Sequence, residues 1–176
     1  MAIDESRTFK PITIAVLTVS DTRTAEDDTS GDILAARIEA AGHTLAARTI
    51  VRDDAALLAA QFEAWIDDPA IDAIVSTGGT GLTGRDVTPE ALGQIREARE
   101  IPGFGELFRW LSFKTIGTST IQSRACAVVA RGTYIFALPG SNGAVKDGWD
   151  GILAEQLDSR NRPCNFVELM PRLREV

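Results

Sequence analysis

The stretch from Thr77 to Asp86 combines closely spaced glycines with an acidic residue. Four glycines fall within the seven residues that begin at Gly78, and threonines lie among them. Glycine lets bare backbone approach a bound group, and free amide N–H groups at the start of a helix bind anions. The carboxylate of Asp86 would repel such an anion unless a cation lay between them. Mg²⁺ suits that place, because it binds one or two carboxylates together with phosphate oxygens.

A second carboxylate, Asp53, follows a predicted strand that ends at Val51. Because parallel strands end at one edge of a sheet, Asp53 and Asp86 could face each other across a magnesium–triphosphate. Simpler interpretations exist. The sole role of Asp54 could be to cap a helix, and the sole role of Asp86 could be to stabilise a nearby helix N-terminus. The residues alone leave the metal-binding and the capping interpretations equally open.

The glycine loop also fits one nucleotide-binding pattern in part. Gly79 to Gly84 matches G-x-G-x-x-G, but that pattern should follow the first strand of a fold, and here it follows the third. A Walker loop is excluded, because it needs a lysine and none lies nearby. We therefore expect a simpler anion-binding loop between a strand and a helix. A turn that merely needs glycine torsions is the alternative, although it does not explain the interspersed threonines.

Polar residues also follow the first and the last long strands, so they should reach the same edge of the sheet. Three such loops on one rim predict a site for a polyanionic, oxygen-rich small molecule, and they argue against a purely structural assembly protein. The residues are Ser20, Asp21, Ser30 and Gly31 after the first strand, and Pro139, Gly140 and Ser141 after the last.

Strand and helix patterns alternate along the chain, which predicts a mostly parallel sheet with helices on both faces. We expect one three-layer α/β domain over residues 1–176, with a core of about 10–167, flexible tails at 1–9 and 168–176, and a small antiparallel hairpin at Arg131-Gly132. Ser30, Asp54 and Thr88 are predicted to be helix N-caps. The tail from Asn161 shows little hydrophobic periodicity. The strands are predicted at 12–19, 44–51, 71–76, 125–130 and 133–138, and the helices at 30–41, 54–67, from 88, 104–124 and 144–157.

Composition and net charge argue against several classes of function. A net charge of −7 argues against nucleic-acid binding, and the chain shows neither a signal peptide nor an apolar run long enough for a membrane span. Cys126 lies in an apolar run and is expected to be a buried, reduced thiol, so we expect a cytoplasmic protein. The single histidine, His43, follows a predicted helix end, where a cation would suit the dipole. Catalysis would therefore depend on carboxylates, backbone amides and a hard metal ion.

Aromatic residues gather in one helical segment, at Phe104, Phe108, Trp110 and Phe113. Together with the neighbouring leucines they cover more than one face of a helix. Complete burial of this helix is one interpretation. A subunit interface, in which aromatic residues are enriched, is the other.

Thr77 to Gly81, Arg85 to Ala91 and Leu138 to Ser141 together resemble the molybdenum cofactor biosynthesis family typified by MoaB and MogA, which is related to the G domains of gephyrin. The resemblance covers about residues 10–167. The segments Gly103 to Arg124 and Arg162 to Phe166 look specifically like the MoaB branch. The family implies an α/β fold that binds molybdopterin, a pterin with a dithiolene and a terminal phosphate.

In the adenylyltransferase branch of this family, the molybdopterin phosphate is joined to AMP from Mg-ATP and pyrophosphate is released. The resemblance thus implies catalytic, Mg²⁺-binding roles for Asp53 and Asp86. It also implies a trimer or hexamer, and other molybdenum cofactor enzymes are possible partners. A protein that binds pterin or nucleotide without turnover is the alternative. Further family positions are Thr77, Gly78, Gly79, Thr80 and Gly81 for phosphates, with Ser30, Gly31, Ser123, Pro139, Gly140 and Ser141 elsewhere in the site.

Overall fold

Six strands form one sheet at the centre of the protein, whose computed structural model describes residues 3–175. The strand order is β2-β1-β3-β6-β5-β4. The first four strands in this order are parallel, whereas β5 pairs antiparallel with both β6 and β4. The strands are β1 (Thr13–Val19), β2 (Thr44–Val51), β3 (Ala73–Thr77), β4 (Arg99–Glu100), β5 (Cys126–Ala130) and β6 (Thr133–Leu138).

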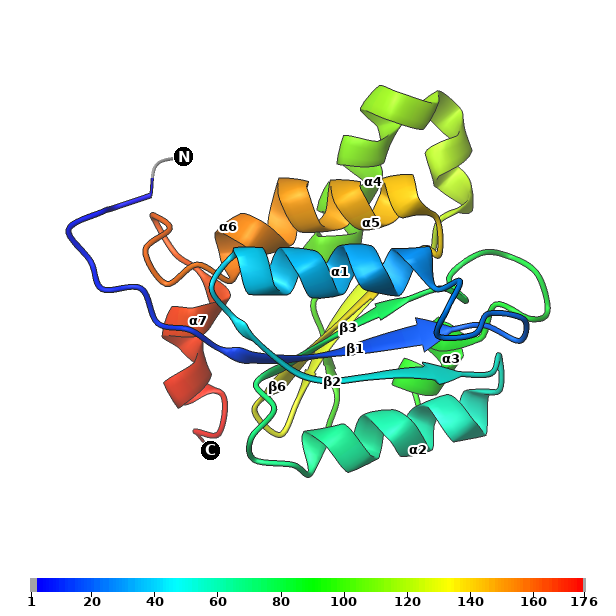
Figure 1. Cartoon of the computed structure of the whole chain (residues 1–176), viewed down its shortest axis with the longest axis horizontal. Coiled ribbons are helices and arrows are strands. Elements are labelled where there is room, and N and C mark those ends of the chain that lie inside the picture. Colours follow the sequence, from blue (N-terminus) through cyan, green and yellow to red (C-terminus); the bar gives the residue numbers. More distant parts are fainter. Residues whose placement is uncertain (1–2, 176) are drawn as a thin grey trace.

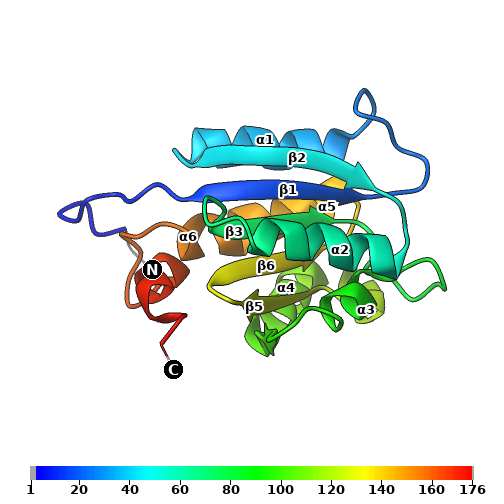
Figure 2. The same ribbon diagram turned by 90° about the horizontal axis from the view of Figure 1, so that it is seen from below.

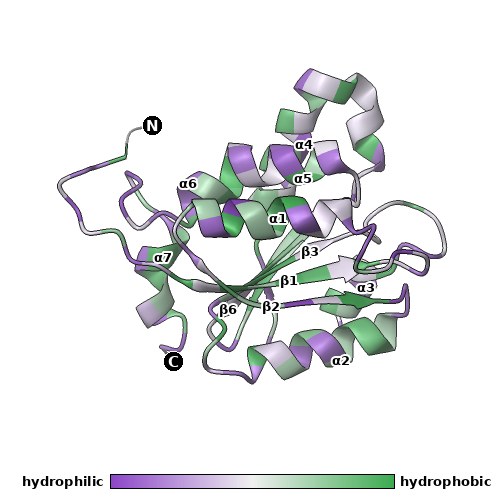
Figure 3. Cartoon of the chain, in the orientation of Figure 1, coloured by the Kyte–Doolittle hydropathy of each residue, from purple (hydrophilic) through white to green (hydrophobic). Residues whose placement is uncertain are grey.

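Helices cover both faces of this sheet, which confirms the three-layer α/β class with its antiparallel hairpin (Figures 1 and 2). One face is packed around Phe104, Phe136 and Trp149, and the other around Phe62 and Ile74. Hydrophobic residues run along the central strands (Figure 3). The first face carries α1 (Thr29–Ala40), α4 (Pro102–Ile116) and α5 (Asn142–Gly148), and the second carries α2 (Ala55–Ile66) and α3 (Thr88–Leu92).

Two of the three predicted helix caps are wrong. Asp28 caps α1, because its carboxylate accepts the amide of Gly31 at 3.0 Å, and Ser30 lies inside the helix. Thr88 also lies inside its helix, where its hydroxyl donates to the carbonyl of Gly78 at 2.9 Å. Both polar residues are used in tertiary contacts that local sequence does not reveal. The third prediction is confirmed, because Asp54 caps α2.

The predicted helical region of residues 104–124 consists of two elements. Helix α4 ends at Ile116, and the next residue, Gly117, has a φ of +59°, a left-handed conformation that glycine adopts easily. The 3₁₀ helix η1 (Gly117–Gln122) then leads back toward the sheet. Together α4 and η1 form an arm that rises above α5 in Figure 1.

The aromatic residues of this arm divide between two sides of α4. Phe104 and Phe108 are buried against the sheet, whereas Trp110 and Phe113 are 58% and 55% exposed. Complete burial of the helix is therefore wrong as an interpretation. The exposed side stays available for another contact.

The last predicted helix is interrupted. It runs as α5, a π-helical turn η2 (Trp149–Leu153) and a short α6 (Ala154–Gln156). The sequence patterns also missed the two-residue edge strand β4 and, in the tail, α7 (Phe166–Leu169) with the 3₁₀ turn η3 (Met170–Arg172). These elements are too short to show a periodic pattern.

The carboxyl ends of β1, β3 and β6 lie side by side at one edge of the sheet. From this edge the chain continues into α1 and α5 on one face, but into α3 on the other. A crevice at such a divergence is the usual ligand site of an open α/β sheet. The fold therefore brings the three predicted polar loops to one place.

His43 lies near the opposite end of β1. Its Nδ1 accepts the amide of Ile12 at 3.3 Å, its ring packs against Phe9, and burial lowers its pKa although the charge of Asp158 raises it. An imidazole that accepts through Nδ1 is neutral and carries its proton on Nε2. The expectation of a favourable cation at the end of α1 is therefore wrong, and His43 lies away from the three loops.

Cys126 and the chain ends complete the fold. Cys126 is a free, half-buried thiol, and burial raises its pKa to about 11. Of the predicted flexible tails, residues 1, 2 and 176 lie outside the described residues, whereas Arg7 forms an ion pair with Glu168. Within residues 3–175, no helix combines the length and the apolar character that a membrane span requires.

Phe62 and Leu57 on α2 allow a test of this packing. Phe62 is fully buried, whereas Leu57 is 53% exposed. Phe62→Ala should lower the free energy of unfolding by about 3–5 kcal/mol through lost burial and a residual cavity, and Leu57→Ala by less than about 0.5 kcal/mol. Urea unfolding of both variants measures this difference, and equal losses would contradict the placement of α2.

Candidate functional site

The glycine loop begins where the backbones of three strands crowd together. The amide of Gly78 donates to the carbonyl of Leu138 at 2.9 Å, and a Cβ added to Gly78 would lie 2.3 Å from the carbonyl oxygen of Val19. Its φ of +107° would also strain any other residue. A Cβ on Gly140 would lie 3.3 Å from the Cα of Gly78. Glycine is thus needed to join the loops after β1, β3 and β6.

The next residues of the loop present backbone amides. Within residues 3–175, the amides of Gly79 and Thr80 donate no hydrogen bond, although the carbonyls of both residues are paired, with Thr88 and Arg124 respectively. Free N–H groups at the carboxyl edge of a parallel sheet can bind an anion. This arrangement supports the anion-binding interpretation of the loop over a simple turn.

Asp86 lies directly against the loop. Its Oδ2 accepts the amide of Thr83 at 2.9 Å and the Thr83 hydroxyl at 2.7 Å, and a Cβ on Gly81 would lie 2.8 Å from that oxygen. Partial burial alone would raise the pKa of Asp86, but the hydrogen bonds from Thr83 and the Gly81 amide lower it. Asp86 is therefore kept as a carboxylate in a fixed position.

Asp53 approaches the same loop from the end of β2. A Cβ on Gly79 would lie 3.4 Å from its Oδ1. Partial burial first, and then the negative charge of Asp86, raise the pKa of Asp53. Neither carboxylate forms an ion pair with another described residue. The charge of Arg124 helps to lower the pKa of Asp86 without forming an ion pair with it, whereas Asp53 has no such partner. A bound cation would relieve the repulsion of Asp53 by Asp86.

Mg²⁺ fits this pair of carboxylates. No group of three or more His, Cys, Asp or Glu side chains in residues 3–175 could hold a metal ion. Asp53 and Asp86 supply two hard oxygen ligands, and Mg²⁺ typically completes its shell with substrate phosphates and water. The residues thus match a metal that arrives with a phosphate ligand, rather than a resident metal in a closed cage.

Arg124, which the sequence analysis did not single out, holds the glycine loop in place. Its amide donates to the carbonyl of Thr80 at 2.8 Å, and its Nε donates to the carbonyl of Gly81 at 2.6 Å. Its guanidinium also contacts the carbonyl of Asp86 and pairs with Glu90. Arg124 therefore positions both ends of the segment that carries Asp86. In the sequence, only its position directly after the predicted site residue Ser123 indicated a role for Arg124.

Asp21 and Ser20 support the site from the loop after β1. Asp21 accepts the amide of Asp53 at 3.2 Å and forms ion pairs with Arg85 and Arg52. The Ser20 hydroxyl accepts the amides at positions 22 and 23, which closes a local turn. These side chains bind other parts of the protein and position Asp53 and the loop, and a direct role toward a ligand stays a prediction.

A buried carboxylate, Asp28, organises the start of α1. It is fully buried, accepts the Thr18 hydroxyl at 2.7 Å, and forms ion pairs with Arg48 at 2.8 Å and Arg23 at 3.5 Å. Burial would raise the pKa of Asp28, but these partners and the Gly31 amide lower it. Asp28 therefore stays charged and ties α1 to β1 and β2.

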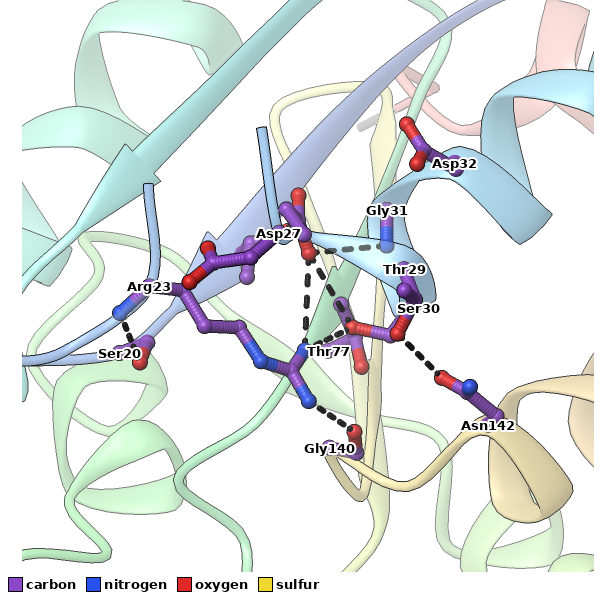
Figure 4. A network of polar contacts seen from close by, with 12 residues as sticks. Ser20, Arg23, Asp27, Thr29, Ser30, Gly31, Asp32, Thr77, Gly140 and Asn142 are labelled. Carbon is purple, nitrogen blue, oxygen red and sulfur yellow. Dashed lines mark hydrogen bonds and ion pairs between the residues drawn. The ribbon is translucent and has the colours of Figure 1, made fainter. Parts of the chain in front are cut away.

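Ser30 and Gly31 belong to this network. Ser30 is buried and accepts a hydrogen bond from Arg23, whose guanidinium also donates to the carbonyl of Gly140 at 3.2 Å (Figure 4). A Cβ on Gly31 would lie 2.1 Å from Asp28. Arg23 thus connects the loop after β1 with the loop after β6. The sequence showed Arg23 only as one polar residue in the loop after the first strand.

The remaining predicted site residues lie in the glycine loop and in the segments next to it. Thr77 is buried, and its hydroxyl donates to the carbonyl of Pro139 at 3.2 Å. Ser141 caps α5, and the Ser123 hydroxyl accepts the amide of Ala125 at 3.2 Å. Thr80 is 2% exposed, and its hydroxyl has no hydrogen-bond partner among the described residues.

A cavity of about 280 Å³ opens beside Thr80 and Gly81, between the arm and α5. Ser123, Pro139 and Ser141 line it. Two other hollows, of about 570 and 710 Å³, lie along β5 and beside the C-terminal residues, and neither contains Thr80. Asp86 lines a separate hollow of about 260 Å³, together with Thr83 and Arg124. The cavity of about 280 Å³ adjoins the glycine loop, because Thr80 and Gly81 line it.

Comparison with known proteins identifies the family. Residues 15–159 match the family described as "Probable molybdopterin binding domain". The chain is 51% identical over 161 residues to Molybdenum cofactor biosynthesis protein B of Escherichia coli (strain K12), covering 92% of this chain and 94% of that protein. It is 42% identical over 160 residues to the protein of that name from Bacillus subtilis (strain 168), covering 89% and 94%.

Solved structures of similar fold support the same family. A crystal structure of Molybdenum cofactor biosynthesis protein B has a TM-score of 0.85 at 33% identity, over 97% of this chain and all of that one. The tungsten cofactor synthesizing protein MoaB from Pyrococcus furiosus has a TM-score of 0.75 at 33% identity, over 94% and 99%. The chain therefore belongs to the molybdopterin-binding family of MoaB and MogA proteins, and its pathway is molybdenum cofactor biosynthesis.

Asp53→Asn should stabilise the protein without ligand at neutral pH. The raised pKa of Asp53 means that its ionisation weakens the folded state, so its contribution is most favourable in acid and is lost as the pH rises through that pKa. We expect a melting temperature about 1–3 °C above the native value at pH 7, and a smaller difference at about pH 4. Differential scanning calorimetry at both pH values measures this.

Asp54→Asn is the matched control for this experiment. It removes the adjacent carboxylate but keeps the helix cap, because asparagine caps helices about as well as aspartate. An equal gain in melting temperature in this control would indicate a general effect of net charge, and would contradict repulsion between Asp53 and Asp86.

Proposed function

We propose that this protein adenylylates molybdopterin with Mg-ATP and releases pyrophosphate. The convergence of Asp53 and Asp86 on a loop with free amides, beside a cavity, carries this proposal. Membership of the molybdopterin-binding family supplies the pterin substrate. ATP supplies the polyphosphate that would require a cation between the aspartates.

The reaction needs alignment more than a strong base. An oxygen of the molybdopterin phosphate attacks the α-phosphorus of ATP, the bond from that phosphorus to the bridging oxygen breaks, and pyrophosphate leaves with the electron pair. The attacking phosphate is already ionised at neutral pH, so no side chain has to remove a proton from it. This explains how a site without a histidine can catalyse the step.

Each part of the site has a role in this reaction. The amides of Gly79 and Thr80 would bind and orient phosphate oxygens, and Arg124 holds the loop that presents them. Asp53 and Asp86 would hold Mg²⁺, which supplies charge neutralisation to the phosphates. The repulsion between the two carboxylates in the free protein favours arrival of the ion together with the nucleotide.

Asp86→Asn tests the proposal. Purified native protein with Mg-ATP and molybdopterin should release pyrophosphate and form adenylylated molybdopterin. Asp86→Asn should lower kcat on the order of a hundredfold through lost charge neutralisation, while pterin affinity changes much less. A coupled pyrophosphate assay and chromatography of the product measure both activities.

Asp68→Asn is the control, because it makes the same charge change in the turn between α2 and β3, away from the loop. Absence of product from the native chain, while an active adenylyltransferase reacts in parallel, would reject catalysis. The protein would then bind pterin or nucleotide in the same pathway without turnover.

We also propose that the exposed side of the arm joins copies of this chain. Leu107, Trp110, Phe113 and Ile116 on α4 are 41–58% exposed, and Ile121 on η1 is 82% exposed. Exposed apolar side chains that cluster on one element in this way often mark an interface. The trimer or hexamer that the family resemblance implies would bury it.

Trp110→Glu combined with Phe113→Glu should convert the assembly to monomers, because a charge would have to be buried at each position. Size-exclusion chromatography with light scattering measures the mass. Leu57→Glu, which places a charge at an equally exposed leucine on α2, should leave the assembly intact. A native protein that is already monomeric would disprove this interface.

A further inference from the structure

The arginines near the glycine loop differ in how firmly the protein holds them. Arg23 and Arg124 each donate to backbone carbonyls, which fixes both side chains. The guanidinium of Arg85 has a single partner among residues 3–175, the carboxylate of Asp21. The Arg85 side chain is also 69% exposed. Most of its N–H donors are therefore free to bind a ligand.

Arg85 lies where the proposed reaction needs a cation. It directly precedes Asp86, at the end of the loop that carries the free amides. Its partner Asp21 accepts the amide of Asp53 at 3.2 Å. Arg85 is thus a neighbour of both proposed Mg²⁺ ligands, of Asp86 along the chain and of Asp53 through Asp21.

The ion pair between Arg85 and Asp21 can be exchanged at little cost. Ion pairs of exposed side chains contribute little to stability. Asp21 would keep a cation nearby, because Arg52 approaches the same carboxylate at 3.7 Å. A Cβ added to Gly84 would meet no atom within 4 Å, so this part of the loop is open. Arg85 can therefore turn from Asp21 to a ligand without leaving a buried charge unpaired.

The leaving pyrophosphate is the group that most needs such a cation. Mg²⁺ neutralises only part of the charge of a triphosphate, and the charge on the leaving oxygen grows as its bond to the α-phosphorus breaks. A guanidinium binds phosphate oxygens through paired N–H groups and stays protonated throughout.

We propose that Arg85 exchanges Asp21 for the two terminal phosphates of the nucleotide and stabilises them as they leave. The electron pair of the broken bond stays on the pyrophosphate, to which Arg85 donates hydrogen bonds, and Arg85 transfers no proton. The proposal rests on the proposed function for the identity of the nucleotide.

Pyrophosphate binding to the full chain tests this role without turnover. The probe is pyrophosphate with Mg²⁺, in the absence of molybdopterin, measured by titration calorimetry at neutral pH. Arg85→Ala should weaken binding on the order of tenfold or more. Arg85→Lys should weaken it less, because lysine keeps the charge but loses the paired donors.

Arg96→Ala is the matched control. The Arg96 side chain is 71% exposed and pairs with Glu63, and its backbone carbonyl accepts a hydrogen bond from Arg131 in the turn before β6. It therefore lies at the edge of the sheet opposite the glycine loop. The pyrophosphate affinity of this variant should equal that of the native protein.

Asp21→Asn tests the exchange of partners. Asparagine can still accept the amide of Asp53, but it no longer competes as a charge for Arg85. Pyrophosphate should bind about two- to fivefold more tightly than to the native protein, and much of this gain should disappear when Arg85→Ala is added. Weaker binding in Asp21→Asn would mean that the ion pair has to stay intact, and would overturn the exchange.

The remaining outcomes separate this inference from the proposed catalysis. A lower melting temperature of Arg85→Ala with an unchanged pyrophosphate affinity would assign the ion pair a structural role and overturn the proposal. Adenylylation whose kcat/KM for Mg-ATP does not fall in Arg85→Ala would overturn it as well. Pyrophosphate binding that depends on Arg85 in a protein without turnover would uphold the phosphate-binding role and reject only catalysis.

Discussion

The repulsion between Asp53 and Asp86 is the interaction on which the candidate site depends. Both carboxylates are held against a loop whose free amides suit anions, and no cationic side chain of the described residues pairs with either. A fold selected for stability alone would pair or remove these charges. A ligand that brings a cation together with phosphates would explain why both carboxylates are present. Nucleotidyl transfer requires such a combination of cation and phosphates.

The rest of the structure holds this unfavourable arrangement in place. Thr83 fixes Asp86, Asp21 fixes the backbone at Asp53, and Arg124 fixes the loop between them. On the other side, Asp28 and Arg23 tie the start of α1 to the loop after β6. The charged groups of these supports are largely satisfied within the protein, so the two catalytic candidates and the cavity are left for the ligand.

The site also separates two kinds of recognition. Backbone amides and the aspartate pair suit the phosphates, whereas the mostly apolar cavity beside Thr80 suits a heterocycle. The arm that forms one wall of this cavity exposes apolar side chains on its outer side. Assembly through the arm would therefore steady the wall against which the ring packs, and would connect oligomer formation with ligand binding.

The sequence by itself determined the α/β class, the parallel strands and the meeting of three polar loops, because strand and helix periodicity are local and parallel strands share one edge. It also indicated Asp53 and Asp86, through glycine spacing and strand ends. Only the tertiary structure decided that Asp28 caps α1, that His43 is neutral and remote, and that Arg124 holds the glycine loop. These features depend on burial and on contacts between distant segments, which no local pattern encodes.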